Sequence, residues 1–93
     1  MSITTAQALS SADYRGTVCV LVYNDGTPAN VGDDVTARIF RPTEGTRYVL
    51  SDGRAPHKPG SSGKVYVKAY RGDNVGVSEY YPSVIKAKWQ PAA

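Results

Sequence analysis

Hydrophobic and polar side chains alternate along much of the second half of the chain, with the period of two that is typical of β-strands. The clearest example is 64–71, where Val65, Val67 and Ala69 would point to one face of a sheet. The side chains that would point to the opposite face are polar or aromatic: Lys64, Tyr66, Lys68 and Tyr70. We therefore predict a strand with one buried face over 64–71.

Five further segments have strand-like patterns, separated by turn signals such as Asn24-Asp25-Gly26 and Gly72-Asp73-Asn74. Thr17–Tyr23 is apolar on both faces and is predicted to be a central strand. The other predicted strands are Val35–Arg41, Arg47–Leu50, Val75–Tyr81 and Val84–Trp89. Six short strands with turn signals between them predict an all-β fold, a small antiparallel sandwich or barrel.

The chain has 93 residues, which suits a single domain. We divide it into an N-terminal arm (1–16), a β-domain (17–89) and a C-terminal tail (90–93). The arm is small and polar, and its few sizeable apolar side chains are Ile3, Leu9 and Tyr14. Residues 5–12 suit either a short helical turn, weakened by two serines, or an extended arm that docks on a neighbour.

The net charge of +3 is unevenly distributed. Residues 1–46 contain three arginines and five acidic residues, whereas 47–93 contain eight basic and three acidic residues. This asymmetry predicts that the second half faces an acidic partner, the alternative being a charge that only keeps the domain soluble. The sequence shows no secretory signal and no membrane-spanning run, so we expect synthesis in the cytoplasm and no membrane partner.

The sequence argues against catalysis and against bound metals or cofactors. A single cysteine, Cys19, and a single histidine, His57, cannot form an internal disulfide or a structural zinc site. A phosphate-binding P-loop would need a glycine at Lys58 and a helix after Lys64, and neither condition is met. Three aspartates near one loop lack the spacing of an EF-hand and are expected to bond their own turns: Asp25, Asp33 and Asp34. We expect a non-enzymatic protein without cofactor or metal.

The long segment between two predicted strands, 51–64, is basic and contains two prolines. Prolines reduce the conformational entropy that a loop loses when it docks on a partner. Loops of this length often have a function. We therefore predict that Arg54, His57 and Lys58 bind a partner, the alternative being a solvated connection between strands.

The row Lys64, Tyr66, Lys68 and Tyr70 has three interpretations. Tyrosine and lysine are common on solvent-facing strands, and tyrosine is also enriched in protein interfaces. Aromatic rings beside cations are, in addition, how single-stranded nucleic acid is bound on a β-sheet. In that last case Arg38, Phe40 and Tyr48 would extend the face from neighbouring strands.

The overall layout resembles small virion accessory proteins of tailed bacteriophages, especially capsid decoration or cement proteins. The resemblance lies in a small-residue arm (1–16), a disulfide-free β-domain with long Gly/Pro loops (27–34 and 51–63) and a short tail. It implies an all-β domain on the capsid surface that binds the major capsid protein or another virion protein, often as an oligomer. It carries over no individual functional residue.

We therefore expect a structural protein of the virion that stabilises the shell, with partner contacts in the arm (Ile3, Leu9, Tyr14) and in the basic loop (Arg54, His57, Lys58). Two alternatives stay open. One is a small β-barrel that binds single-stranded nucleic acid through the tyrosine–lysine row. The other is a phage-encoded inhibitor of a host protein, acting through the same surfaces.

Overall fold

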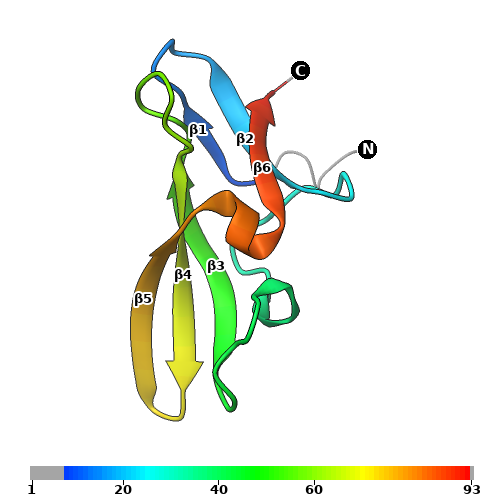
Figure 1. The fold of residues 1–93 in the computed structure, drawn as a ribbon, viewed down its shortest axis with the longest axis vertical. Coiled ribbons are helices and arrows are strands. Elements are labelled where there is room, and N and C mark those ends of the chain that lie inside the picture. Colours follow the sequence, from blue (N-terminus) through cyan, green and yellow to red (C-terminus); the bar gives the residue numbers. More distant parts are fainter. Residues whose placement is uncertain (1–7, 93) are drawn as a thin grey trace.

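Two three-stranded antiparallel sheets form the structure, a computed structural model that describes residues 8–92 (Figure 1). The first sheet has the order β1–β2–β6, with β1 at Ser10–Ala12, β2 at Val18–Tyr23 and β6 at Ala87–Pro91. The second has the order β3–β4–β5, with β3 at Arg47–Arg54, β4 at Lys64–Arg71 and β5 at Asn74–Tyr80. Two short 3-10 turns complete the fold, η1 at Thr36–Arg38 and η2 at Pro82–Ile85. The predicted small β-sandwich of six strands is confirmed.

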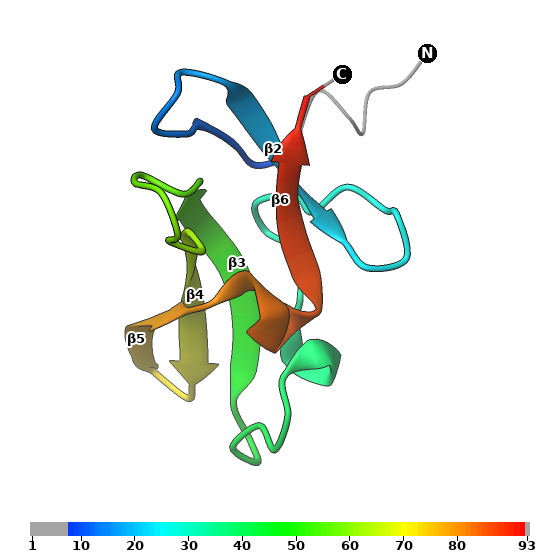
Figure 2. The same ribbon diagram turned by 45° about the horizontal axis from the view of Figure 1, so that its top comes forward.

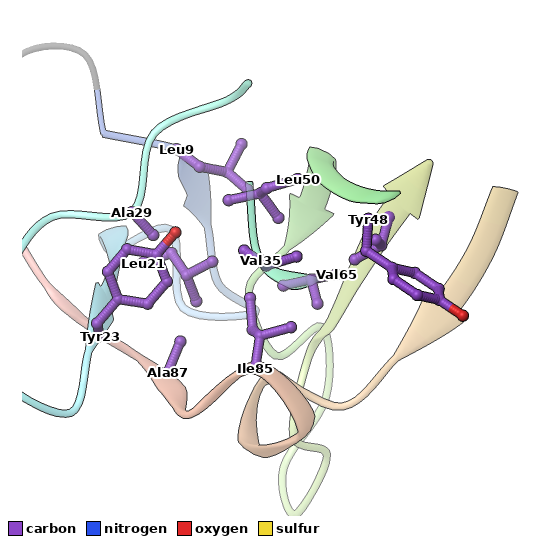
Figure 3. Packing of buried hydrophobic residues seen from close by; sticks show 11 residues of the cluster. Leu9, Leu21, Tyr23, Ala29, Val35, Tyr48, Leu50, Val65, Ile85 and Ala87 are labelled. Atoms are coloured by element: carbon purple, nitrogen blue, oxygen red, sulfur yellow. The ribbon is translucent and has the colours of Figure 1, made fainter. Parts of the chain in front are cut away.

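The hydrophobic core lies between the sheets and is closed by η2 and by the segment before η1 (Figure 3). Its largest fully buried side chains come from both sheets and from these turns: Leu21, Val35, Leu50, Val65, Val67 and Ile85. In β4 the alternation holds as predicted, since Val65 and Val67 are fully buried while Lys64 and Lys68 are exposed. The pattern of the sequence thus assigns the two faces of this strand correctly.

The predicted strand at Val35–Arg41 is wrong. Val35 is buried, but the chain then makes the single turn η1, in which the Arg38 N–H donates to the Val35 carbonyl over 3.0 Å. The Asp34 side chain favours this turn because its Oδ1 accepts a hydrogen bond of 2.9 Å from the Thr36 N–H. The alternation of Thr36 to Phe40 therefore belongs to a turn, and Phe40 is 84% exposed.

The N-terminal segment joins the sandwich at residues 8–12. β1 pairs with β2 in the register Ser11 opposite Cys19, so the structure shows extended backbone and no helical turn at Ser10–Ala12. The Leu9 side chain is buried in the core. Its backbone N–H donates to the Ala29 carbonyl over 2.8 Å. Ile3 lies outside the described residues.

The end of the chain differs from the prediction in register. Val84–Ile85 belong to η2, and Lys86 adopts a left-handed conformation with φ of 55° that ends the turn. Strand β6 begins only at Ala87, and it includes Gln90 and Pro91, which the sequence placed in a tail. Within the described residues, no helix has the length and apolar character needed to cross a membrane.

Candidate binding surface

The β3–β4–β5 sheet has one face turned away from the core, which we call the outer face. Cross-strand pairing builds it from three rows: Arg47–Tyr70–Val75, Val49–Lys68–Val77 and Asp52–Tyr66–Glu79. A fourth pair, Arg54 opposite Lys64, lies next to the long loop. The tyrosine–lysine row of the sequence therefore forms the middle of this face.

The outer face combines aromatic, cationic and aliphatic side chains. The Arg47 guanidinium carbon lies 5.2 Å from the centroid of the Tyr70 ring, within cation–π distance. Val75 and Val77 are 57% and 63% exposed, so two aliphatic side chains face solvent beside the cations. Exposed apolar groups among cations and tyrosines are typical of surfaces that bind another protein.

The predicted extension of this face by Arg38, Phe40 and Tyr48 is wrong. Tyr48 belongs to the inner face of β3 and is 7% exposed. The Arg38 guanidinium carbon lies 3.5 Å from the centroid of the Tyr23 ring, which comes from the other sheet. Phe40 follows η1 and lies outside both sheets.

Lys64 and Glu79 form an exposed ion pair at the loop end of the outer face, with 2.9 Å between Nζ and Oε1. The hydrogen bond to Glu79 raises the pKa of Lys64 above its ordinary value. The hydrogen bond from Lys64, followed by that from Tyr66, lowers the pKa of Glu79. Both groups are therefore charged at neutral pH, and Lys64 neutralises the Glu79 carboxylate.

The long loop and the outer face share an open depression of about 510 Å³, which we call the basic hollow. Its cationic and aromatic lining comes from both parts of the chain: Arg54, His57, Lys58, Lys64, Tyr66 and Tyr81. Lys64 Nζ also lies 5.3 Å from the centroid of the Tyr81 ring. Two groups of residues that the sequence suggested separately, the basic loop and the start of the tyrosine–lysine row, thus line one surface.

Contacts at both ends of the loop hold the basic hollow in place. At its start, Ala55 is buried, and the Pro56 carbonyl accepts a hydrogen bond of 3.0 Å from the Tyr14 N–H. At its end, Gly63 is buried and has a φ of +66°, a conformation that side chains disfavour. A Cβ atom at Gly63 would lie 2.5 Å from the Arg54 carbonyl oxygen, so only glycine fits there.

A second hollow of about 340 Å³ adjoins the first and shares Ser62 and Tyr81 with it. Trp89 contributes to its wall from β6. The Trp89 Nε1 atom is buried and has no hydrogen-bond acceptor among the described residues. The two hollows together extend the candidate surface from β4 to β6.

Three other reactive or charged side chains, Cys19, Asp25 and Asp33, make local contacts within the fold. Burial, followed by the nearby Asp13 carboxylate, raises the pKa of the Cys19 thiol, which favours an unreactive side chain. Asp33 accepts hydrogen bonds from Tyr23 Oη at 2.7 Å and from the Asn30 N–H at 2.9 Å, and Asp25 accepts one from the Thr27 N–H at 2.9 Å. In the part of the chain that the structure describes, no three potential metal ligands come together.

Of the predicted arm contacts, Leu9 is buried in the core of the protein itself. Tyr14 is 42% exposed and lies next to Pro56, near the start of the basic loop. Figure 2 shows this loop, after β3, near the turn between β1 and β2. Lys68 and Tyr70 lie on the outer face, farther from the hollow.

Sequence reasoning missed Tyr81, Glu79 and the two exposed valines. For Glu79 and the valines the hairpin turn at 72–74 contained the necessary signal, because it fixes which β5 residue lies opposite each β4 residue.

Comparison with known proteins gives no match to a family model, to a curated protein or to a solved structure.

Proposed function

We propose that this protein is a non-enzymatic binding protein that docks on an acidic surface of a partner protein through the basic hollow and the outer face. The observation that supports this most is the charge of the hollow. Arg54, Lys58 and Lys64 line it with a single carboxylate, that of Glu79, which Lys64 already neutralises. Two cations are left without an ionic partner among the described residues, so the hollow suits an anionic group of a partner.

The composition of the outer face favours a protein as this partner. Val75 and Val77 offer exposed aliphatic surface, which gains free energy when it is buried against other apolar groups. Tyrosine and arginine side chains near them add the aromatic and guanidinium contacts that dominate many interfaces.

We further propose that the partner is a component of a virion shell, most simply the major capsid protein, and that the chain acts as a decoration protein. A domain that binds the assembled shell and not the unfolded capsid protein stabilises the shell by mass action. The proposal places the chain on the capsid surface, after its synthesis in the host cytoplasm.

A test uses assembled shells that lack this chain, to which the purified protein is added at about 50 and 200 mM salt. We expect co-sedimentation with the shells, a rise in their melting temperature, and weaker binding at the higher salt. Replacement of both Arg54 and Lys58 by Gln should reduce binding at least tenfold. No binding to the shells at either salt concentration would overturn the capsid proposal.

The matched control for this test removes two other cations, with the double variant Arg41→Asn and Lys86→Asn. Both residues have a left-handed φ of 55°, a conformation that Asn tolerates, and neither lines a hollow. This control should bind as tightly as the unmodified chain. Equal losses in the two double variants would show that net charge, and not the basic hollow, governs binding.

Single-stranded nucleic acid is the second candidate partner. The observation in its favour is that Tyr66 and Tyr70 lie on one face with Lys68 between them, an arrangement that could stack bases and bind phosphates. The test is a fluorescence-anisotropy titration of a labelled strand of about 20 nucleotides at the two salt concentrations. This function requires salt-sensitive binding that is lost when both tyrosines are replaced by alanine, whereas the protein-docking proposal predicts weak binding that these substitutions leave unchanged.

A further inference from the structure

Strand β5 forms an open edge of the β3–β4–β5 sheet (Figure 1). The two-residue loop Gly72-Asp73 closes the β4–β5 hairpin, with Arg71 opposite Asn74. In such a hairpin the closing pair exchanges hydrogen bonds, and every second pair after it does the same. The backbone N–H and C=O groups of the intervening residues Val75, Val77 and Glu79 therefore point away from β4, and no other described residue forms a backbone hydrogen bond with them.

The other sheet edges are protected, which sets β5 apart. The far edge of β3 is covered by residues 32–35, since the Gly32 N–H donates to Leu50 and the Val35 N–H donates to Tyr48, each over 2.8 Å. β1 has only three residues, and β6 contains a lysine and a proline, the side chains that natural proteins use to block edges. β5 has seven residues and contains no proline and no lysine, and its pairing with β4 has no bulge.

We propose that β5 pairs edge to edge with β5 of a second copy of this chain, to form an antiparallel, two-fold symmetric dimer with one continuous six-stranded sheet. The register that overlaps all seven residues places Val77 opposite Val77 of the second copy. Each outward-pointing peptide group then finds a partner, and Gly76 lies opposite the small side chain of Ser78. This inference does not depend on the proposed function.

The charge distribution fits a second copy of the chain as the occupant of this edge. Glu79 is the only charged residue in β5, and Lys64 holds it at 2.9 Å, so the paired strands face no like-charge repulsion. In this register, two valines separate the two Lys68 side chains across the seam. At the usual strand spacing the lysines are about 14 Å apart, which is beyond the screening length in physiological salt.

Pairing of one strand per chain covers less area than the roughly 1,200 Å² of stable protein interfaces, so the dimer should be weak and should form at roughly 100 µM and above. Such a dimer would join two outer faces into one surface with a basic hollow on each half. A repeating partner would then bind both halves together, with the gain in apparent affinity that multivalency gives.

The test is sedimentation velocity of the protein alone from about 10 µM to 1 mM, a range that spans the expected dissociation constant. The average mass should rise from 10.0 kDa towards twice that value. Val77→Lys should abolish the rise, because it places two cations at the two-fold axis. Val18→Lys, on the other sheet and similarly exposed, is the matched control and should associate like the unmodified chain.

Hydrogen exchange of the unmodified chain provides a second measurement that needs no variant. The amide protons of Val75, Val77 and Glu79 should exchange at least several-fold more slowly at the highest concentration than at the lowest. The proposal is overturned by a mass that stays at that of the monomer throughout, by association that survives Val77→Lys, or by slowed exchange that excludes these three amides. Because no partner is present, failure here leaves the docking proposal untouched, and failure of docking leaves the dimer untouched.

Discussion

Gly63 ends the basic loop, and its replacement by alanine tests whether the loop is fixed as the structure shows. Its φ of +66° lies in the left-handed region, where a Cβ atom costs about 1–2 kcal/mol. The same Cβ atom would lie 2.5 Å from the Arg54 carbonyl oxygen and 2.9 Å from Trp89 Nε1, so backbone and ring must move. Overpacking of this kind adds about 1–3 kcal/mol. We therefore expect Gly63→Ala to lower the free energy of unfolding by about 2–5 kcal/mol.

The control for this substitution is Gly60→Ala in the same loop. Gly60 has a φ of +82°, but a Cβ atom there would meet nothing within 4 Å. Gly60→Ala should therefore lower the free energy of unfolding only by the cost of the left-handed backbone conformation, about 1–2 kcal/mol. The difference between the two variants therefore isolates the packing of Gly63 against β3 and β6.

The assay is equilibrium unfolding in urea, followed by the fluorescence of Trp89, the only tryptophan. A domain of this size has a total stability of about 5–14 kcal/mol, so a loss at the upper end of the expected range could unfold the protein. Equal losses for Gly63→Ala and Gly60→Ala would refute the close packing at Gly63, and with it the position of the loop that forms the basic hollow.

Two further predictions concern the core and the pH dependence of stability. Ile85→Ala should lower the free energy of unfolding by about 2–5 kcal/mol in urea denaturation, because Ile85 is fully buried. The control Val75→Ala, on the exposed outer face, should lower it by less than about 0.5 kcal/mol. Similar losses at the two sites would contradict the assigned core. Burial, followed by the hydrogen bond to Asp33, raises the pKa of Tyr23 well above the value of about 10 found in unfolded chains. The contribution of Tyr23 to the free energy of unfolding is thus fully present below pH 10. It should fall as the pH rises further, because the Tyr23 hydroxyl then loses its proton in the unfolded chain before it does so in the folded one. Unfolding experiments from about pH 9 to 11.5 should show a smaller alkaline loss in Tyr23→Phe than in the unmodified chain, and the same slope in both would disprove the assignment.

The sequence predicted those strands whose pattern reflects the core directly. β2 and β4 were correctly identified, because their apolar residues pack between the sheets and strong turn signals bound them. The strand predicted at 35–41 was wrong because side-chain alternation does not reveal that the Asp34 side chain favours a turn. β1 contains only serine and alanine, so its pairing with β2 comes from tertiary contacts and left no hydrophobic signal.

The candidate surface was predictable in its parts but not as a whole. Arg54, Lys58 and Lys64 were prominent in the sequence as cations of one region. Their combination with Tyr81 in one hollow depends on how the loop folds back, which Gly63 and the contact between Tyr14 and Pro56 determine. Such long-range packing has no periodic signature in a sequence.

An NMR titration tests whether the basic hollow and the outer face form one surface for an acidic protein partner. Nitrogen-15-labelled protein is titrated with short poly-L-glutamate at about 50 and 200 mM salt. We expect amide shifts that concentrate in residues 54–66 and 79–81, weaken at the higher salt and disappear in the Arg54→Gln, Lys58→Gln variant. Shifts confined to other parts of the chain, or an unchanged response in that variant, would contradict the docking proposal.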